Sequence, residues 1–60
     1  MAKIGDKIKI TYMSGEPRYT GKEGTITSID CMGQFHGTWG GLAVIPGEDG
    51  YIVLQKAEDK

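Results

Sequence analysis

The chain has 60 residues, a hydrophobic fraction of 38% and a net charge of −1. A domain of this size buries only about 60% of its unfolded surface, which leaves little room for an internal active-site cavity, and the small net charge excludes a strong overall attraction to nucleic acid or membranes. The single cysteine, Cys31, excludes an internal disulfide, and no apolar run follows Met1, so we expect a cytoplasmic protein of the producing or host cell, without a membrane span.

The first predicted element is a strand over residues 7–12, KIKITY, in which apolar and polar side chains alternate strictly. Alternation of this kind is typical of a half-buried strand, so we expect its isoleucines and Tyr12 to face inward and its lysines to face solvent. Residues 13–22 contain two glycines and a proline and predict the longest loop of the chain. Long loops on a rigid sheet often carry binding residues.

A second strand is predicted over residues 24–30. Ile26 and Ile29 in this strand are three residues apart, and a regular strand cannot place both on one face. We therefore expect either a bulge between them or a bend that starts at Ile29. A turn at Met32-Gly33 follows the strand.

The third predicted strand covers residues 34–39, with Phe35 and Trp39 facing inward. Gly37 lies between them on the same face and leaves a gap that Tyr12 or Tyr51 could cover. The next two residues, Gly40-Gly41, predict a turn.

The last two predicted strands cover residues 42–45 and 51–54, and the intervening PGEDG segment predicts a short 3₁₀ turn. Together these elements predict an all-β fold: a small five-stranded SH3-like barrel over residues 3–55, with a 3₁₀ turn before the last strand and a charged tail over 56–60. A five-stranded oligonucleotide-binding barrel is the alternative, but it often contains a helix that this sequence lacks. The predicted core consists of Ile8, Ile10, Ile26, Phe35, Trp39, Val44 and Val53.

Two segments of the chain resemble a broad class of small β domains. Residues 4–10 and 21–30 resemble the start of SH3-like domains of the KOW and Tudor-like kind, in which a GD-x-V-x-I strand leads to a G-x-x-G-x-V turn and strand.

A closer resemblance covers nearly the whole chain. A family of short proteins of unknown function from bacteria, their phages and mobile elements has the usual pattern GQIHVxW and then GLALIPG. The chain is similar to it at residues 33–36 (GQFH), Trp39, residues 41–47 (GLAVIPG) and Asp49. The resemblance implies an SH3-like fold and a mobile-element setting, but no activity. The chain departs from this pattern at Gly37, where the family has an apolar residue, and at Gly40-Gly41, where the family has a longer turn.

Catalysis and metal binding both lack the side chains that they need. Cys31 and His36 are the lone cysteine and histidine, and a nucleophilic pair requires contact between them and a third, orienting group. Structural zinc requires four ligands, and these two residues with Asp30 do not form a known zinc pattern. No glycine-rich loop leads into a helix, so no phosphate cradle is expected. We predict no catalytic residue, no metal and no cofactor.

Basic and aromatic side chains concentrate in the first part of the chain, where residues 1–22 carry a formal charge of +3 against −4 for residues 23–60. The predicted partner-binding residues are Lys7, Lys9, Arg18, Tyr19, Lys22 and His36. Such residues can neutralise phosphates and stack on bases, although alternating lysines also simply guard a strand edge. The alternative surface is the acidic region around Asp30, Glu48 and Asp49, which would suit a basic partner.

These observations predict a non-enzymatic binding module of phage or mobile-element origin. Its expected partner is a host protein or a protein–nucleic-acid complex, and inhibition of an antiviral system such as a CRISPR nuclease is one instance. The alternatives are direct KOW-like nucleic-acid binding and a small structural or self-associating phage component. The partner could also add a strand to an open sheet edge.

Overall fold

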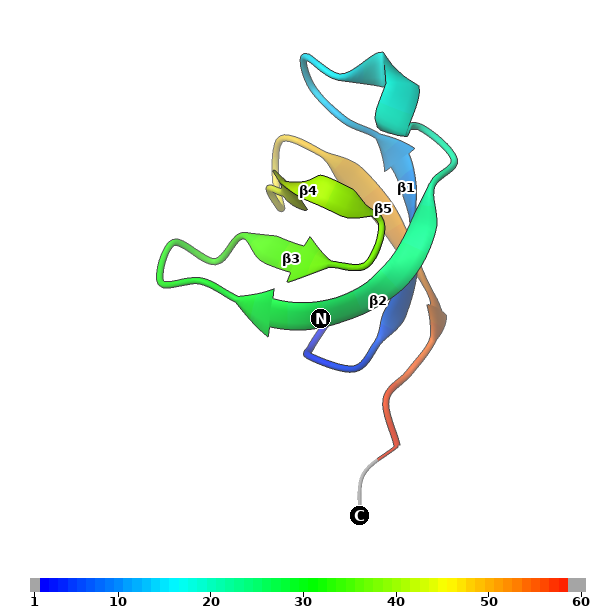
Figure 1. Ribbon diagram of the computed structural model, residues 1–60, viewed down its shortest axis with the longest axis vertical. Coiled ribbons are helices and arrows are strands. Elements are labelled where there is room, and N and C mark those ends of the chain that lie inside the picture. Colours follow the sequence, from blue (N-terminus) through cyan, green and yellow to red (C-terminus); the bar gives the residue numbers. More distant parts are fainter. Residues whose placement is uncertain (1, 59–60) are drawn as a thin grey trace.

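The computed structural model describes residues 2–58 and contains five strands and one turn of 3₁₀ helix. The strands are β1 (Lys7–Tyr12), β2 (Glu23–Ile29), β3 (Phe35–Gly37), β4 (Gly40–Val44) and β5 (Gly50–Gln55), and the 3₁₀ turn is η1 (Pro17–Tyr19). All strand pairs are antiparallel, and the order in the sheet is β4-β3-β2-β1-β5. The chain is therefore all-β, with β4 and β5 as the two edges of one five-stranded sheet (Figure 1).

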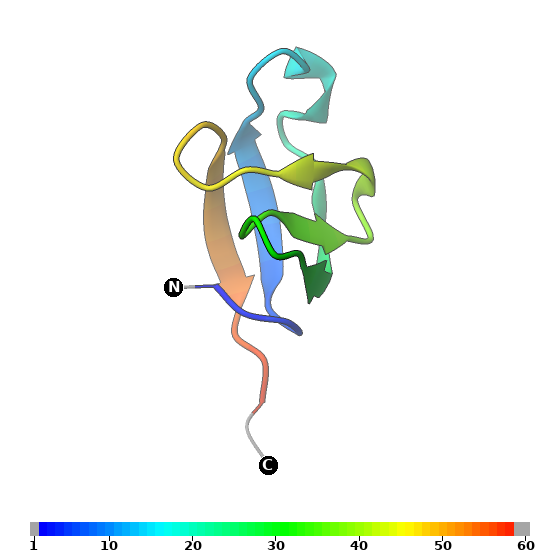
Figure 2. The same cartoon turned by 90° about the vertical axis from the view of Figure 1, so that its left-hand side faces the viewer.

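Strand β2 bends the sheet. Its first residues pair with β1, with Thr25 opposite Lys7, whereas its later residues pair with β3, with Ile29 opposite Phe35. The register shifts between Ile26 and Ser28, which confirms the predicted bulge. A bulge increases local twist and bends the strand, so β2 sweeps round in an arc that joins the two halves of the sheet (Figures 1 and 2).

The core lies on the concave side of this arc. Six of the seven predicted core residues are buried, namely Ile8, Ile10, Ile26, Phe35, Trp39 and Val44, together with Ala2 and Met13. The prediction for Val53 is wrong: it is 37% exposed because β5 is an edge strand with no neighbour on its outer side. Tyr12 is also wrong as an inward residue, because the register of β1 shifts after Ile10 and Met13 takes the buried position instead.

Trp39 closes the core from a turn rather than from a strand. β3 ends at Gly37, and Thr38 and Trp39 form the turn to β4, so Gly40 and Gly41 begin β4 instead of forming the predicted turn. The indole Nε1 donates to the Leu42 carbonyl oxygen at 2.7 Å, and the ring covers Gly37. The gap at Gly37 is thus filled by the neighbouring Trp39 and not, as predicted, by a tyrosine.

The 3₁₀ turn lies in the loop between β1 and β2, not before the last strand as predicted. The segment before β5 is a tight turn in which the Glu48 and Asp49 amides both donate to the Ile45 carbonyl oxygen. The connection between β4 and β5 is therefore a turn held by backbone hydrogen bonds and not a 3₁₀ helix. Among residues 2–58, no helix is long and apolar enough to cross a membrane.

Asp6 joins the two ends of the chain. Its side chain is buried, and its two carboxylate oxygens accept hydrogen bonds from the Lys3 amide at 3.0 Å and the Ala57 amide at 2.7 Å. The hydrogen bond from Ala57, with further contributions from the Lys3 amide and nearby lysine charges, holds the pKa of this carboxyl below its usual range. Residue 57 of the predicted tail is thus tied to the sheet, while residues 59 and 60 lie outside the described residues.

Candidate functional site

The predicted basic residues of β1 lie on the convex side of the sheet, opposite the core. Lys7 alternates with the buried Ile8, and its Nζ is 3.8 Å from a carboxylate oxygen of Glu23, with both side chains about half exposed. Glu23 is also the register partner of Lys9. The positive charge of this strand is therefore partly balanced by the strand next to it.

The predicted basic residues of the long loop also lie beside other side chains. Arg18 Nη2 is 3.8 Å from a carboxylate oxygen of Glu16, and Lys22 Nζ lies 5.5 Å from the centre of the Tyr19 ring. Tyr19 itself packs against the core, with its hydroxyl end over Gly40. Its ring is therefore partly buried and supports the loop.

His36 lies on β3, beyond β2 from the lysines of β1, and does not join them. Its Nε2 is 3.0 Å from Oδ2 of Asp30. This contact, followed by hydrogen bonds from the backbone, lowers the pKa of the Asp30 carboxyl. Cys31 is exposed in the same turn, and among residues 2–58 no cluster of three or more His, Cys, Asp or Glu side chains could hold a metal ion.

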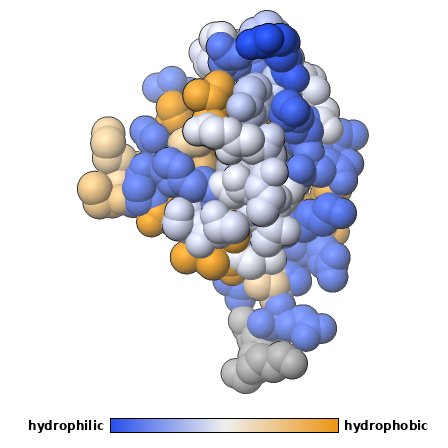
Figure 3. All heavy atoms as spheres, viewed as in Figure 1, coloured by the Kyte–Doolittle hydropathy of each residue, from blue (hydrophilic) through white to orange (hydrophobic). Residues whose placement is uncertain are grey.

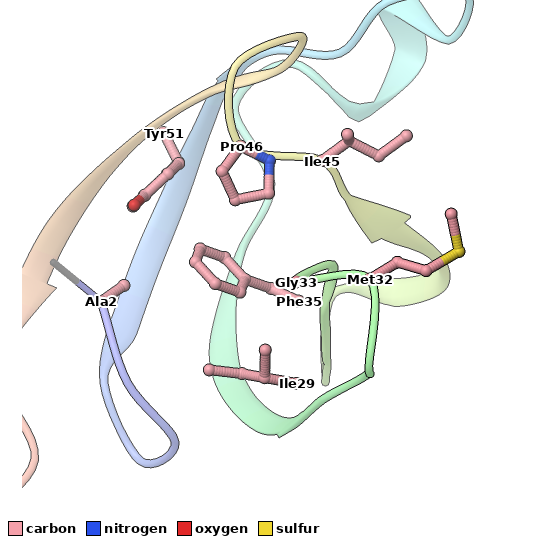
Figure 4. A pocket seen from close by; sticks show the side chains of 8 residues that line it. All are labelled: Ala2, Ile29, Met32, Gly33, Phe35, Ile45, Pro46 and Tyr51. Carbon is pink, nitrogen blue, oxygen red and sulfur yellow. The ribbon is translucent and has the colours of Figure 1, made fainter.

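An open apolar groove of about 330 Å³ lies between the β2–β3 turn and the β4–β5 turn (Figure 4). Phe35 and Tyr51 meet edge to face, with ring centres 5.3 Å apart, and Met32 is 78% exposed at the tip of the β2–β3 turn. This tip projects as a hydrophobic surface at the left of Figure 3. The groove is lined by Ala2, Ile29, Met32, Gly33, Phe35, Ile45, Pro46 and Tyr51.

An aspartate holds each of the two turns that wall the groove. Oδ1 of Asp30 accepts hydrogen bonds from the Met32 amide at 2.9 Å and the Gln34 amide at 3.0 Å, which fixes the β2–β3 turn. The buried Asp49 accepts from the Ile45 amide at 2.8 Å and, through its other oxygen, from the Ser14 amide at 2.9 Å. The groove is therefore formed by tightly hydrogen-bonded turns.

The part of the chain that supplies most of the groove carries more acidic than basic residues. All of its lining residues except Ala2 come from residues 23–55, a stretch with four acidic residues and no lysine or arginine. Three of these acids, Asp30, Glu48 and Asp49, form the alternative binding region expected from the sequence. The groove beside them was missed, although exposed apolar residues at turns, such as Met32 and Pro46, are a signal for it.

The chain was compared with protein-family models, with curated proteins and with solved structures, and no significant match was found in any of the three.

Proposed function

We propose that the protein is a non-enzymatic binding module whose groove receives an apolar side chain of a partner protein. The observation that carries this proposal is the groove itself, with two aromatic rings in its lining and a largely exposed methionine at its mouth. Binding sites are typically concave, mostly apolar and largely preformed. The two turns held by Asp30 and Asp49 favour a preformed site, which lowers the cost of ordering on binding.

The distribution of charged residues favours a protein partner with basic residues. Residues 23–55, which supply all of the groove lining except Ala2, contain four acidic residues and no lysine or arginine, so a segment with basic residues flanking its apolar side chain is complementary to them. The lysines and arginine on the other side give weaker support to direct nucleic-acid binding, because Lys7 and Arg18 each lie beside a glutamate. A protein partner is therefore the stronger proposal.

Two further features support an SH3-like barrel and a mobile-element origin. The strand order and the bend in β2 support an SH3-like barrel arrangement, for which five antiparallel strands with a long first loop are typical. The family resemblance supports a mobile-element origin, in which the partner is a host protein or a protein–nucleic-acid complex.

A displayed library of random peptides, selected on the wild-type protein, tests the proposal. We expect enrichment of peptides with a large aliphatic or aromatic residue flanked by lysine or arginine. The dissociation constant of the best peptide is then measured by fluorescence anisotropy for the wild type and for Met32→Ser. Because burial of a methionine contributes about 1.5–3 kcal/mol, we expect Met32→Ser to raise the dissociation constant about tenfold.

Cys31→Ser is the matched control, since it places the same residue at the neighbouring exposed position outside the groove lining. We expect this control to bind like the wild type. Equal binding by all three proteins, or no enrichment of basic and apolar peptides, would overturn the proposal. Tight binding of a single-stranded oligonucleotide that weakens steeply with salt and is insensitive to Met32→Ser would favour the nucleic-acid function instead.

A further inference from the structure

Strand β5 forms an open edge without charged side chains. Within residues 2–58 it pairs only with β1, and its residues Gly50–Gln55 contain no charge. Three consecutive apolar residues of this strand, Ile52, Val53 and Leu54, are 49%, 37% and 43% exposed. Figure 2 shows β5 along the left margin of the sheet, with no strand on its outer side.

An edge of this kind is unusual in an isolated protein. Natural edge strands are guarded by charged residues, prolines or strong irregularities, because their unpaired amides and carbonyls can pair with another strand. The pairing of β5 with β1 shifts register near both ends, but residues 51–53 pair regularly with residues 8–10. The regular part of β5 is thus also its most apolar part, which is a suitable template for a further strand.

We propose that two copies of the chain associate through an antiparallel β5–β5 pair. Charge selects this partner and this direction: the neutral strand follows the exposed Glu48 and precedes the exposed Lys56. In an antiparallel pair centred on Ile52, Lys56 of each copy lies opposite Glu48 of the other, whereas a parallel pair would bring each of these residues beside its own like-charged counterpart. The regular segment of β5 is centred on Ile52, which would then face its own counterpart across the two-fold axis.

The interface is small, because one pair of short strands buries much less than the roughly 1,600 Å² of a standard protein–protein interface. We therefore expect a weak dimer that forms reversibly as the concentration rises. Sedimentation of the whole protein between about 10 μM and about 1 mM, a range that covers weak association, should give an average mass that rises from 6.5 kDa towards twice that value.

Ile52→Glu tests the position of the interface, because two glutamates would face each other across the axis. Leu42→Glu is the matched control, since Leu42 is similarly exposed on the opposite edge strand β4. Both variants should keep the wild-type circular dichroism spectrum. We expect Ile52→Glu to raise the dimer dissociation constant at least tenfold and Leu42→Glu to change it less than threefold.

A charge swap tests the direction of the pair. Glu48→Lys and Lys56→Glu should each weaken the dimer severalfold, and the double variant should restore it. A single-chain mass at all concentrations, an equal effect of Ile52→Glu and Leu42→Glu, or growth into larger oligomers through both edges would overturn the proposal. None of these measurements involves the groove or a peptide, so their failure is distinct from failure of the proposed function.

Discussion

Replacement of Gly37 by alanine tests how the core is closed. A Cβ atom at this position would lie 2.7 Å from Cη2 of Trp39 and closer still to Cζ3 and to the Thr25 carbonyl oxygen. Carbon atoms in contact normally lie about 3.5–4.0 Å apart, so the overlap with the indole is about 1 Å. The Thr25 oxygen belongs to the backbone of β2, so relief requires displacement of either the indole or the sheet.

The loss of stability in Gly37→Ala depends on whether the sheet or the indole is displaced. Overpacking typically costs about 1–3 kcal/mol, and complete expulsion of the indole would approach the about 3–5 kcal/mol of a Trp→Ala change. For a domain of about 60 residues 1 kcal/mol corresponds to about 8 °C, the upper end of the usual range, so we expect Gly37→Ala to lower the melting temperature by at least about 8 °C. Tryptophan fluorescence should shift to the red as the ring leaves the core.

Gly41→Ala is the matched control for this experiment. A Cβ atom at Gly41 meets nothing within 4 Å, and its backbone is not in the left-handed region. Alanine at such a position restricts the unfolded chain, so the melting temperature should stay the same or rise slightly. Equal melting temperatures for Gly37→Ala and the wild type would refute the packing of Trp39 on Gly37.

Three further predictions concern stability. Trp39→Ala should cost about 3–5 kcal/mol, close to the whole net stability of so small a domain, and a native-like thermal melt would show that the indole is not a core residue. Asp49→Ala leaves two backbone amides without an acceptor, and the loss of even one of these hydrogen bonds should lower the free energy of unfolding by about 1.5–3 kcal/mol. Hydrogen exchange should show both amides less protected, whereas unchanged protection would count against the role of Asp49. The pKa of Asp6 is lowered from 3.8, so the stability that its ionised carboxylate contributes is present above that pH and is lost as the pH falls through the lowered value. Between about pH 5 and about pH 2 the melting temperature of the wild type should therefore fall more than that of Asp6→Asn, and equal decreases would contradict this.

Much of the fold could be predicted from the sequence because strand periodicity specifies which face is buried. The alternation in residues 7–12 correctly gives the bounds of β1 and its buried isoleucines, and the three-residue spacing of Ile26 and Ile29 correctly gives the bulge in β2. The errors lie where register changes or neighbours are absent. The shift after Ile10 turns Tyr12 outward, and the position of β5 at the sheet edge, which depends on the whole topology, exposes Val53.

The candidate site was harder to predict because it depends on contacts between distant segments. The sequence places the basic residues on β1 and the long loop, but it does not show that Lys7 lies beside Glu23 and Arg18 beside Glu16. The groove combines the end of β2, two turns and β5, and the order of these elements in space is not visible in any local pattern. The carboxylates of Asp30 and Asp49, which were expected as surface charge, instead hold the two turns in place.

A titration of ¹⁵N-labelled protein with the selected peptide distinguishes the groove from the basic surface, because amide shifts report which of these two surfaces the peptide contacts. We expect the largest shifts at Met32, Gly33, Phe35 and Tyr51, and we expect Met32→Ser to diminish all of them. Shifts concentrated instead at Lys7, Lys9 and residues 18–22, with the groove amides unchanged, would contradict the claim that the groove is the binding site.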